Sequence, residues 1–173
     1  PYGPAMSDLF PVLRVLGVLL CMFSLAMGLP LAVSLGHDDG VWQAYPLAML
    51  VALGAGASLS WGLRRYKREL QPRHGVILVT LVWVLLPLCA ALPLWLALQW
   101  VDRPVTFTHA YFEAVSGLTT TGSTVLSGVD ALPLSVNVWR TFLQWLGGMG
   151  ILILAVAVLP LLGVGGAQLF KAE

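Results

Sequence analysis

The stretch Phe112-Glu-Ala-Val-Ser-Gly-Leu-Thr-Thr-Thr-Gly-Ser-Thr124 decides the fold of this chain, because its character changes halfway along. Residues His109–Ser116 predict a helix of about ten residues and about 15 Å, half the thickness of a bilayer core, with Thr106 or Thr108 as its N-cap. The following run Gly117–Thr124 predicts extended chain, because threonine is a modest helix former and glycine a poor one. This combination predicts a re-entrant loop, since such backbone is tolerated at membrane depth only where it is buried in protein or lines a watery cavity.

The composition around this stretch is that of an integral membrane protein. Hydrophobic residues make up 58% of the chain and charged residues only 10%, whereas soluble domains carry about a quarter charged residues. A membrane-spanning helix needs roughly 20 apolar residues. Four stretches qualify, at about Leu9–Leu35, Val41–Leu63, Gly75–Trp100 and Val138–Leu162. We therefore predict an all-α membrane protein with four transmembrane helices, plus a re-entrant pore helix and an extended filter loop between the third and fourth.

The charged residues predict the orientation of these helices. Five of the nine basic residues fall in the run Arg64–Arg73, and the positive-inside rule places that loop in the cytoplasm. The amino and carboxyl termini are then also cytoplasmic, while the loops at Asp39 and Asp102 face outward. Aromatic residues near the predicted boundaries are interpreted as interface anchors. They are Trp42, Tyr45, Trp61, Tyr66, Trp100 and Trp139.

A half-membrane helix followed by a Thr/Gly run has the design of a cation filter. Backbone carbonyls of the extended run can replace the hydration shell of an ion, and the helix directs the negative end of its dipole toward the ion path. Gly122 supplies a position where φ can be positive without a side-chain clash. The threonines keep the lining polar without adding fixed charge.

Three motifs carry a family resemblance: Phe112-Glu-Ala-Val-Ser-Gly-Leu-Thr-Thr-Thr-Gly122, Trp139-Arg-Thr-Phe-Leu-Gln-Trp-Leu-Gly-Gly-Met-Gly-Ile151, and the trailing Leu159–Glu173. They closely resemble the first repeat of the TrkH family, the membrane subunits of bacterial Trk potassium uptake systems in the Trk/Ktr/HKT superfamily. Such chains carry four helix–filter–helix repeats around one pore, often preceded by two extra helices. By this resemblance residues 1–8 are an N-terminal remnant, residues 9–70 the two extra helices, and residues 71–173 the first repeat with a cytoplasmic tail.

The resemblance also implies a function, a set of site residues and partners. Thr120 and Thr121 would offer backbone carbonyls to K⁺, and Gly122 would be the filter glycine. The complete ion-binding segment would be Thr119, Thr120, Thr121, Gly122 and Ser123. The implied function is potassium transport across the bacterial inner membrane, by a homodimer that binds cytosolic nucleotide-binding regulatory subunits of the TrkA kind.

The chain contains one filter segment, and one quarter of a filter cannot encircle an ion. Two arrangements are left open. The remaining repeats belong to a longer polypeptide, which we favour, or four identical copies assemble as in simple potassium channels. A non-conducting membrane scaffold is a third reading for the isolated segment, although the Thr/Gly run disfavours it.

Residues near the predicted filter are candidates for its support. Glu113 lies inside the pore helix, and we expect it to brace the filter from behind, with Arg140 as a possible partner; snorkelling of Arg140 to the interface is the alternative. Gly147, Gly148 and Gly150 are expected to allow close helix packing, with a hinge as the alternative.

Other classes of function find little support in the sequence. A net charge of +1 gives no case for nucleic-acid binding, and the two cysteines and three histidines are scattered, unlike the clustered ligands of a zinc site. No serine-nucleophile motif or intramembrane His/Asp pair indicates an enzyme. We predict no organic cofactor.

Overall fold

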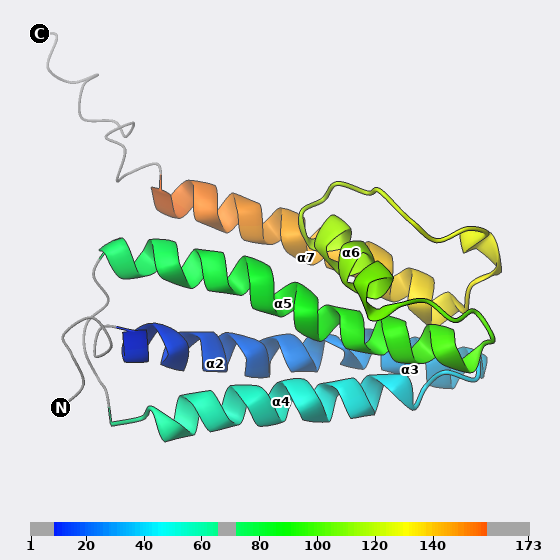
Figure 1. Cartoon of the computed structure of the whole chain (residues 1–173), viewed down its shortest axis with the longest axis horizontal. Coiled ribbons are helices and arrows are strands. Elements are labelled where there is room, and N and C mark those ends of the chain that lie inside the picture. The colour runs from blue at the N-terminus through cyan, green and yellow to red at the C-terminus, as the bar shows by residue number, and fades with distance from the viewer. Residues whose placement is uncertain (1–8, 66–71, 159–173) are drawn as a thin grey trace, which may run out of the picture.

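The computed structural model describes residues 9–65 and 72–158, and every regular element in that part is helical (Figure 1). The elements are α2 (Leu9–Ala26), α3 (Gly28–His37), α4 (Ala44–Gly62), α5 (Pro72–Trp100), α6 (Phe107–Leu118), the short 3₁₀ turn η1 (Val129–Ala131) and α7 (Leu134–Val158). The long helices lie side by side, whereas the short α6 sits against α5 and α7 beneath an arching loop (Figure 1).

Three helical segments of the described part are long and apolar enough to cross a membrane. They are Leu9–His37, Ala44–Gly62 and His74–Trp100, which correspond to the first three predicted crossings. The fourth predicted crossing corresponds to α7, which begins at Leu134 rather than at Val138. Its predicted end at Leu162 lies outside the described residues.

The first crossing is interrupted where α2 meets α3, a break that the sequence reading did not anticipate. Met27 separates the two helices, and Pro30 occupies the first turn of α3. Proline has no N–H, so the carbonyl four residues before it loses its helical donor and the helix kinks. The segment nevertheless continues in one direction, because Leu31 N–H still donates to the carbonyl of Met27 at 3.2 Å.

Helices α2 and α4 pack tightly through a pair of glycines. A Cβ atom built on Gly17 would lie 2.7 Å from the carbonyl oxygen of Gly56, and one built on Gly56 would lie 2.6 Å from the carbonyl oxygen of Gly17. Small residues of this kind let helix backbones approach closely where lipid offers no hydrophobic driving force. Helices α2 to α4 therefore form a packed unit, which we call the helical hairpin.

Helix α5 connects the hairpin to the later elements. It contacts α2 and α4 on one side and α6 on the other, and it contains Pro87 and Pro93. Near each proline a carbonyl accepts a donor from a neighbouring element: Tyr111 Oη donates to the carbonyl of Val84 at 3.3 Å, and Trp139 Nε1 to that of Ala90 at 3.0 Å. Each of these carbonyls lies three residues before a proline, next to the one that the proline leaves without its helical donor, so the contacts join α6 and α7 to α5 near its two prolines.

Two of the predicted interface anchors are wrong. Trp139 is 0% exposed and Tyr45 is 1% exposed, because each finds a hydrogen-bond partner inside the protein for its polar atom. The Tyr45 hydroxyl donates to Ser135 Oγ at 2.9 Å. Trp42, Trp61 and Trp100 are exposed as expected, and Tyr66 lies outside the described residues.

Candidate functional site

Helix α6 begins at a well-defined cap and ends against α7. Of the two candidates for its N-cap, the structure selects Thr106, whose Oγ1 accepts a hydrogen bond from the His109 N–H at 3.3 Å. The helix spans 12 residues, slightly longer than expected. At its far end Gly147 of α7 lies so close that a Cβ there would overlap the carbonyl of Leu118. The packing of α7 thus determines where α6 ends and the extended run begins.

The run that follows α6 is held by hydrogen bonds to Ser116. Its carbonyl accepts from the N–H of Thr121 at 2.9 Å and of Gly122 at 3.4 Å. Its hydroxyl donates to the carbonyl of Ser123 at 2.6 Å. One residue in the last turn of α6 therefore contacts the run at three points, a role that the sequence reading did not assign to Ser116.

The backbone of this run has an uncommon conformation. Thr120 has φ +57° and Gly122 has φ +74°, with Thr121 between them. Glycine adopts positive φ without cost, but a β-branched residue in this region is a genuine outlier. Such strain persists only where the surroundings over-determine it, and it clusters at functional sites.

Four successive carbonyl groups in the run are available to a ligand. The carbonyl oxygens of Thr119, Thr120, Thr121 and Gly122 accept no hydrogen bond from the described residues, and all four residues are exposed. Ser123 differs from the rest of the predicted ion-binding segment, because its carbonyl is engaged by Ser116. Exposed carbonyl oxygens that accept no hydrogen bond within the protein can coordinate a cation.

Glu113 joins α6 to the end of the run that is nearer α7 in sequence. Its Oε1 accepts from Thr124 Oγ1 and from the Val125 N–H, both at 2.7 Å. Its Oε2 pairs with Arg140, whose Nε and Nη2 each lie at 2.9 Å. The Glu113 side chain is only 2% exposed, and a buried charge is tolerated when it is paired and hydrogen-bonded in this way.

One face of α7 follows the run along its length. Arg140 reaches Thr124 and Val125 through Glu113. One turn later, Gln144 Nε2 lies 3.8 Å from where a Cβ of Gly122 would be. After another turn, a Cβ on Gly148 would lie 3.8 Å from Thr120 Cγ2. Residues four apart share a helix face, so α7 forms a wall alongside the filter-like segment.

The predicted glycine cluster on α7 divides by environment. Gly147 is buried against Leu118, and Gly148 faces Thr120. Gly150 has open space where a Cβ would be. The close approach of α7 to the end of α6 therefore depends on Gly147.

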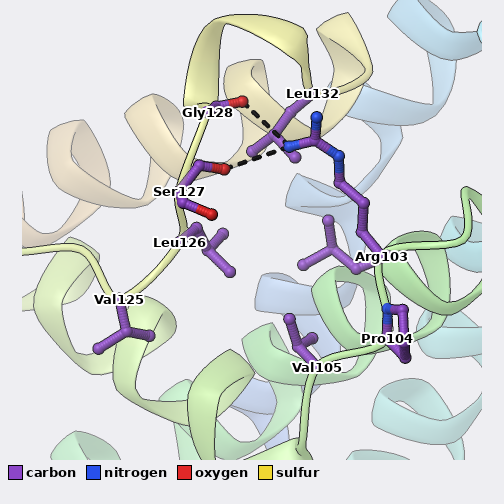
Figure 2. A pocket seen from close by; sticks show the side chains of 9 residues that line it. Arg103, Pro104, Val105, Val125, Leu126, Ser127, Gly128 and Leu132 are labelled. Atoms are coloured by element: carbon purple, nitrogen blue, oxygen red, sulfur yellow. Dashed lines mark hydrogen bonds between the residues drawn. The ribbon is translucent and has the colours of Figure 1, made fainter.

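The loop that returns from the run to α7 is held by two polar side chains that the sequence reading did not single out for this role. Arg103 Nη1 donates to the carbonyls of Ser127 at 3.2 Å and Gly128 at 3.1 Å (Figure 2). Asn137 Nδ2 donates to the carbonyl of Val129 at 2.9 Å. A pocket of about 380 Å³ lies between this loop and the α5–α6 connection, and residues of both segments line it. The loop is therefore tied at both its α5 and its α7 side.

The arrangement can bind a cation through backbone oxygens rather than side chains. No group of three or more His, Cys, Asp or Glu side chains that could hold a metal ion occurs among residues 9–65 and 72–158. The exposed carbonyls of residues 119–122 are consecutive, and Ser116 and Glu113 hold the segment that carries them.

Comparison with known proteins gives one consistent result. Residues 43–173 match the family model "TrkH: Cation transport protein". The chain is 48% identical over 162 residues to the Trk system potassium uptake protein TrkH of Halomonas elongata, and 47% identical over 163 residues to that of Salmonella typhimurium. Both alignments cover 94% of this chain and 33% of the relative.

A solved structure is similar over the same region. The crystal structure of the potassium transporter TrkH from Vibrio parahaemolyticus superposes with a TM-score of 0.81 at 42% sequence identity, covering 91% of this chain and 33% of that one. The chain thus spans about one third of the length of the relatives it matches.

Proposed function

This chain belongs to the TrkH family of cation transport proteins, and from that premise we propose that it supplies one of the four walls of a potassium-selective filter. The observation that supports the proposal most directly is the run of four exposed, unpaired carbonyls at residues 119–122. Carbonyl oxygens of this kind replace the hydration shell of K⁺ in selectivity filters. The transported ion is the cargo of the protein and interacts with backbone oxygens of Thr119, Thr120, Thr121 and Gly122.

Only part of the filter is formed by this chain, so further walls complete it. Because the TrkH relatives are about three times longer, we favour further repeats of the same kind within one polypeptide over four identical copies. In that arrangement residues 9–70 form two extra helices and residues 71–173 the first helix–pore loop–helix repeat. The stoichiometry of the chain in its assembly distinguishes the two.

The proposed membrane topology follows from the charges and from the helix ends. Helix α7 makes the fourth crossing and α6 enters only part of the bilayer, with Arg64 and Arg65 on the cytoplasmic side of the bacterial inner membrane. The free carbonyls of the run then lie at membrane depth, where a cation supplies the missing polar contact. This placement makes α6 a pore helix.

Glu113 and Arg140 act as filter support in this proposal, and they do not contact the ion. The carboxylate of Glu113 already accepts two filter-side donors and an arginine, which holds the outer end of the filter behind the ion path. Gly147 and Gly148 let α7 pack beside the filter, whereas Gly150 is the candidate for a hinge because nothing packs against it.

The proposed partners are those of the whole family. We infer a homodimer in the membrane and a cytosolic, nucleotide-binding regulatory subunit of the TrkA kind. The exposed Arg64 and Arg65 lie at the end of the hairpin that would face such a subunit.

The test uses a chimera in which this chain replaces the matching third of Halomonas elongata TrkH, expressed in a bacterial strain that lacks its own potassium uptake. We expect the chimera to restore rubidium uptake and growth at low K⁺. Gly122→Asp should abolish that uptake, because Gly122 has φ +74° and an added carboxylate would lie at the filter.

A control is Gly62→Asp. Gly62 is the last residue of α4, at the opposite end of that helix from Asp39, and a Cβ there would meet open space. It should retain uptake. Unchanged rubidium uptake in the Gly122→Asp chimera would contradict the proposed function.

A further inference from the structure

The end of the helical hairpin that carries Asp39 contacts the first turn of α7. Helix α3 ends at His37, and its C-cap Asp38 adopts a left-handed conformation with φ +49°. This turn directs the next residue, Asp39, toward α7. Helix α7 has four N-terminal N–H groups that lack partners within the helix, and Ser135 supplies one of them.

The carboxylate of Asp39 collects hydrogen bonds from both sides of this contact. Its Oδ2 accepts from the Ser135 N–H of α7 at 3.0 Å. Its Oδ1 accepts from the Ser34 hydroxyl and, at 3.4 Å, from the Val41 N–H of the hairpin. Burial alone would raise the pKa of Asp39, but these hydrogen bonds outweigh it and hold the pKa below its ordinary value of 3.8. The contact therefore contains an ionised carboxylate at neutral pH.

A second bond strengthens the same contact from within the core. The Tyr45 hydroxyl of α4 donates to Ser135 Oγ at 2.9 Å, and both side chains are buried. The hairpin thus holds Ser135 by its backbone through Asp39 and by its side chain through Tyr45. A negative charge at a helix N-terminus is also favoured by the helix dipole.

The part of α7 that the hairpin holds is the part that braces the filter. Asn137 bonds to the carbonyl of Val129 in the return loop, and Arg140 pairs with Glu113. Glu113 in turn bonds to Thr124 and Val125. Ser135 and Arg140 lie within two turns of one rigid helix, so the position of Ser135 sets the position of the Arg140 guanidinium.

We propose that Asp39 is a positioning residue for the filter, acting through the N-terminus of α7. The two helices that precede the repeat then serve as an outer brace for the filter, in addition to any packing role. This inference rests on the proposed function, because it concerns ion selectivity. Asp39 does not contact the ion.

The experiment compares Asp39→Asn with Asp38→Asn in the active chimera. Both changes remove one negative charge at adjacent positions, but no hydrogen bond from another described side chain or backbone group reaches the Asp38 carboxylate. An asparagine at position 39 would turn its amide NH₂ group toward N–H and hydroxyl groups that donate to the Asp39 carboxylate. We measure the rubidium concentration for half-maximal uptake, the inhibition by Na⁺, and the amount of protein in the membrane.

We expect Asp39→Asn to raise the half-saturating rubidium concentration, and to strengthen inhibition by Na⁺, by between about twofold and thirtyfold, the range for networks that couple distant positions. Asp38→Asn should match the unmodified chimera. Equal behaviour of the two variants would overturn the inference. A fall in maximal rate in proportion to protein amount, with saturation and Na⁺ inhibition unchanged, would overturn it as well, because that result describes folding alone.

A milder variant keeps the test decisive where Asp39→Asn does not reach the membrane. Ser34→Ala removes one donor to the carboxylate and leaves its charge in place. A smaller shift in the same direction supports the inference, and no shift overturns it. Activity of the unmodified chimera is measured first, so that a failure of the proposed function is distinguished from a failure of this inference.

Discussion

The helical hairpin of α2 to α4 and the repeat of α5 to α7 differ in how their backbone N–H and carbonyl groups are paired. In the hairpin nearly all backbone groups are paired within the helices, and the two long elements touch directly at Gly17 and Gly56. In the repeat, residues 119–125 leave the helix, and side chains from α6 and α7 hold them. Packing of small residues is sufficient for a scaffold, whereas irregular backbone in a membrane protein requires a dedicated polar network.

A substitution of Glu113 is expected to have the largest effect in this comparison. Replacement by alanine removes both bonds to residues 124 and 125 and leaves the partly buried Arg140 without its charged partner; breaking a fully buried pair costs about 3–5 kcal/mol, so we expect a loss toward the lower end of that range. We expect loss of rubidium uptake together with a marked fall in the thermal unfolding midpoint.

Asp130→Asn is the matched control, since Asp130 is an acidic residue in the return loop of the same repeat. This variant should keep the rubidium uptake and the unfolding temperature of the unmodified chimera. The charge exchange Glu113→Arg with Arg140→Glu gives a second measurement. The exchange should recover part of the unfolding temperature but not the uptake, because an arginine at position 113 cannot accept the bonds from Thr124 and Val125. An unfolding temperature no higher than that of the single variants would argue against the ion pair as a source of stability.

A pair of glycines compares the two regions directly. Gly17→Ala places a methyl group 2.7 Å from the Gly56 carbonyl, and Gly147→Ala makes one overlap the carbonyl of Leu118. Overpacking of this kind costs about 1–3 kcal/mol, so both variants should unfold at lower temperature. Only Gly147→Ala should also alter Na⁺ inhibition, because Leu118 directly precedes the filter.

Gly54→Ala in α4 is the control, because its Cβ would meet open space. A different outcome is that Gly17→Ala and Gly147→Ala change Na⁺ inhibition by the same amount. That result would contradict the view that the hairpin is a scaffold and that only the repeat shapes the filter.

Substitutions of two tyrosines are expected to have the smallest effects on stability. Tyr45→Phe removes the buried bond from the hairpin to Ser135 of α7, and Tyr111→Phe removes the bond from α6 to the carbonyl of Val84. Hydrogen bonds between membrane helices contribute on average about 0.6 kcal/mol and at most about 1.7 kcal/mol.

We expect the larger loss for Tyr45→Phe, measured by chemical unfolding in detergent. Its bond is 2.9 Å long and buried, whereas that of Tyr111 is 3.3 Å and exposed. A greater loss for Tyr111→Phe would indicate that the contact between α6 and α5 is the stronger of the two.

Several features of the fold could be predicted because they depend on composition and local pattern. Three crossings, the start of α6 near Thr106 and the irregular run after it follow from hydropathy, capping and helix propensity. The interface role of Trp139 and Tyr45 was wrong, because an aromatic residue near a predicted boundary has the same sequence signature whether it faces lipid or another helix.

The network around the filter could be predicted only in part. Glu113 and Arg140 are conspicuous as charges near apolar segments, so their pairing could be considered in advance. Ser116, Arg103 and Asn137 were missed, since serine, arginine and asparagine are common near loops and their partners are backbone carbonyls without a sequence signal. The positive φ of Gly122 could be anticipated from glycine, but that of Thr120 could not.

The sequence by itself determined that this is a helical membrane protein with a half-length helix and a Thr/Gly run between its last two long segments. Those properties depend on the length and polarity of contiguous residues, which transfer energies govern locally. The tertiary structure alone decided that Asp39 lies against Ser135, that Gly147 lies against Leu118, and that four carbonyls remain free. These features depend on which residues distant in sequence the packed helices bring together, and local propensity and hydropathy do not determine that.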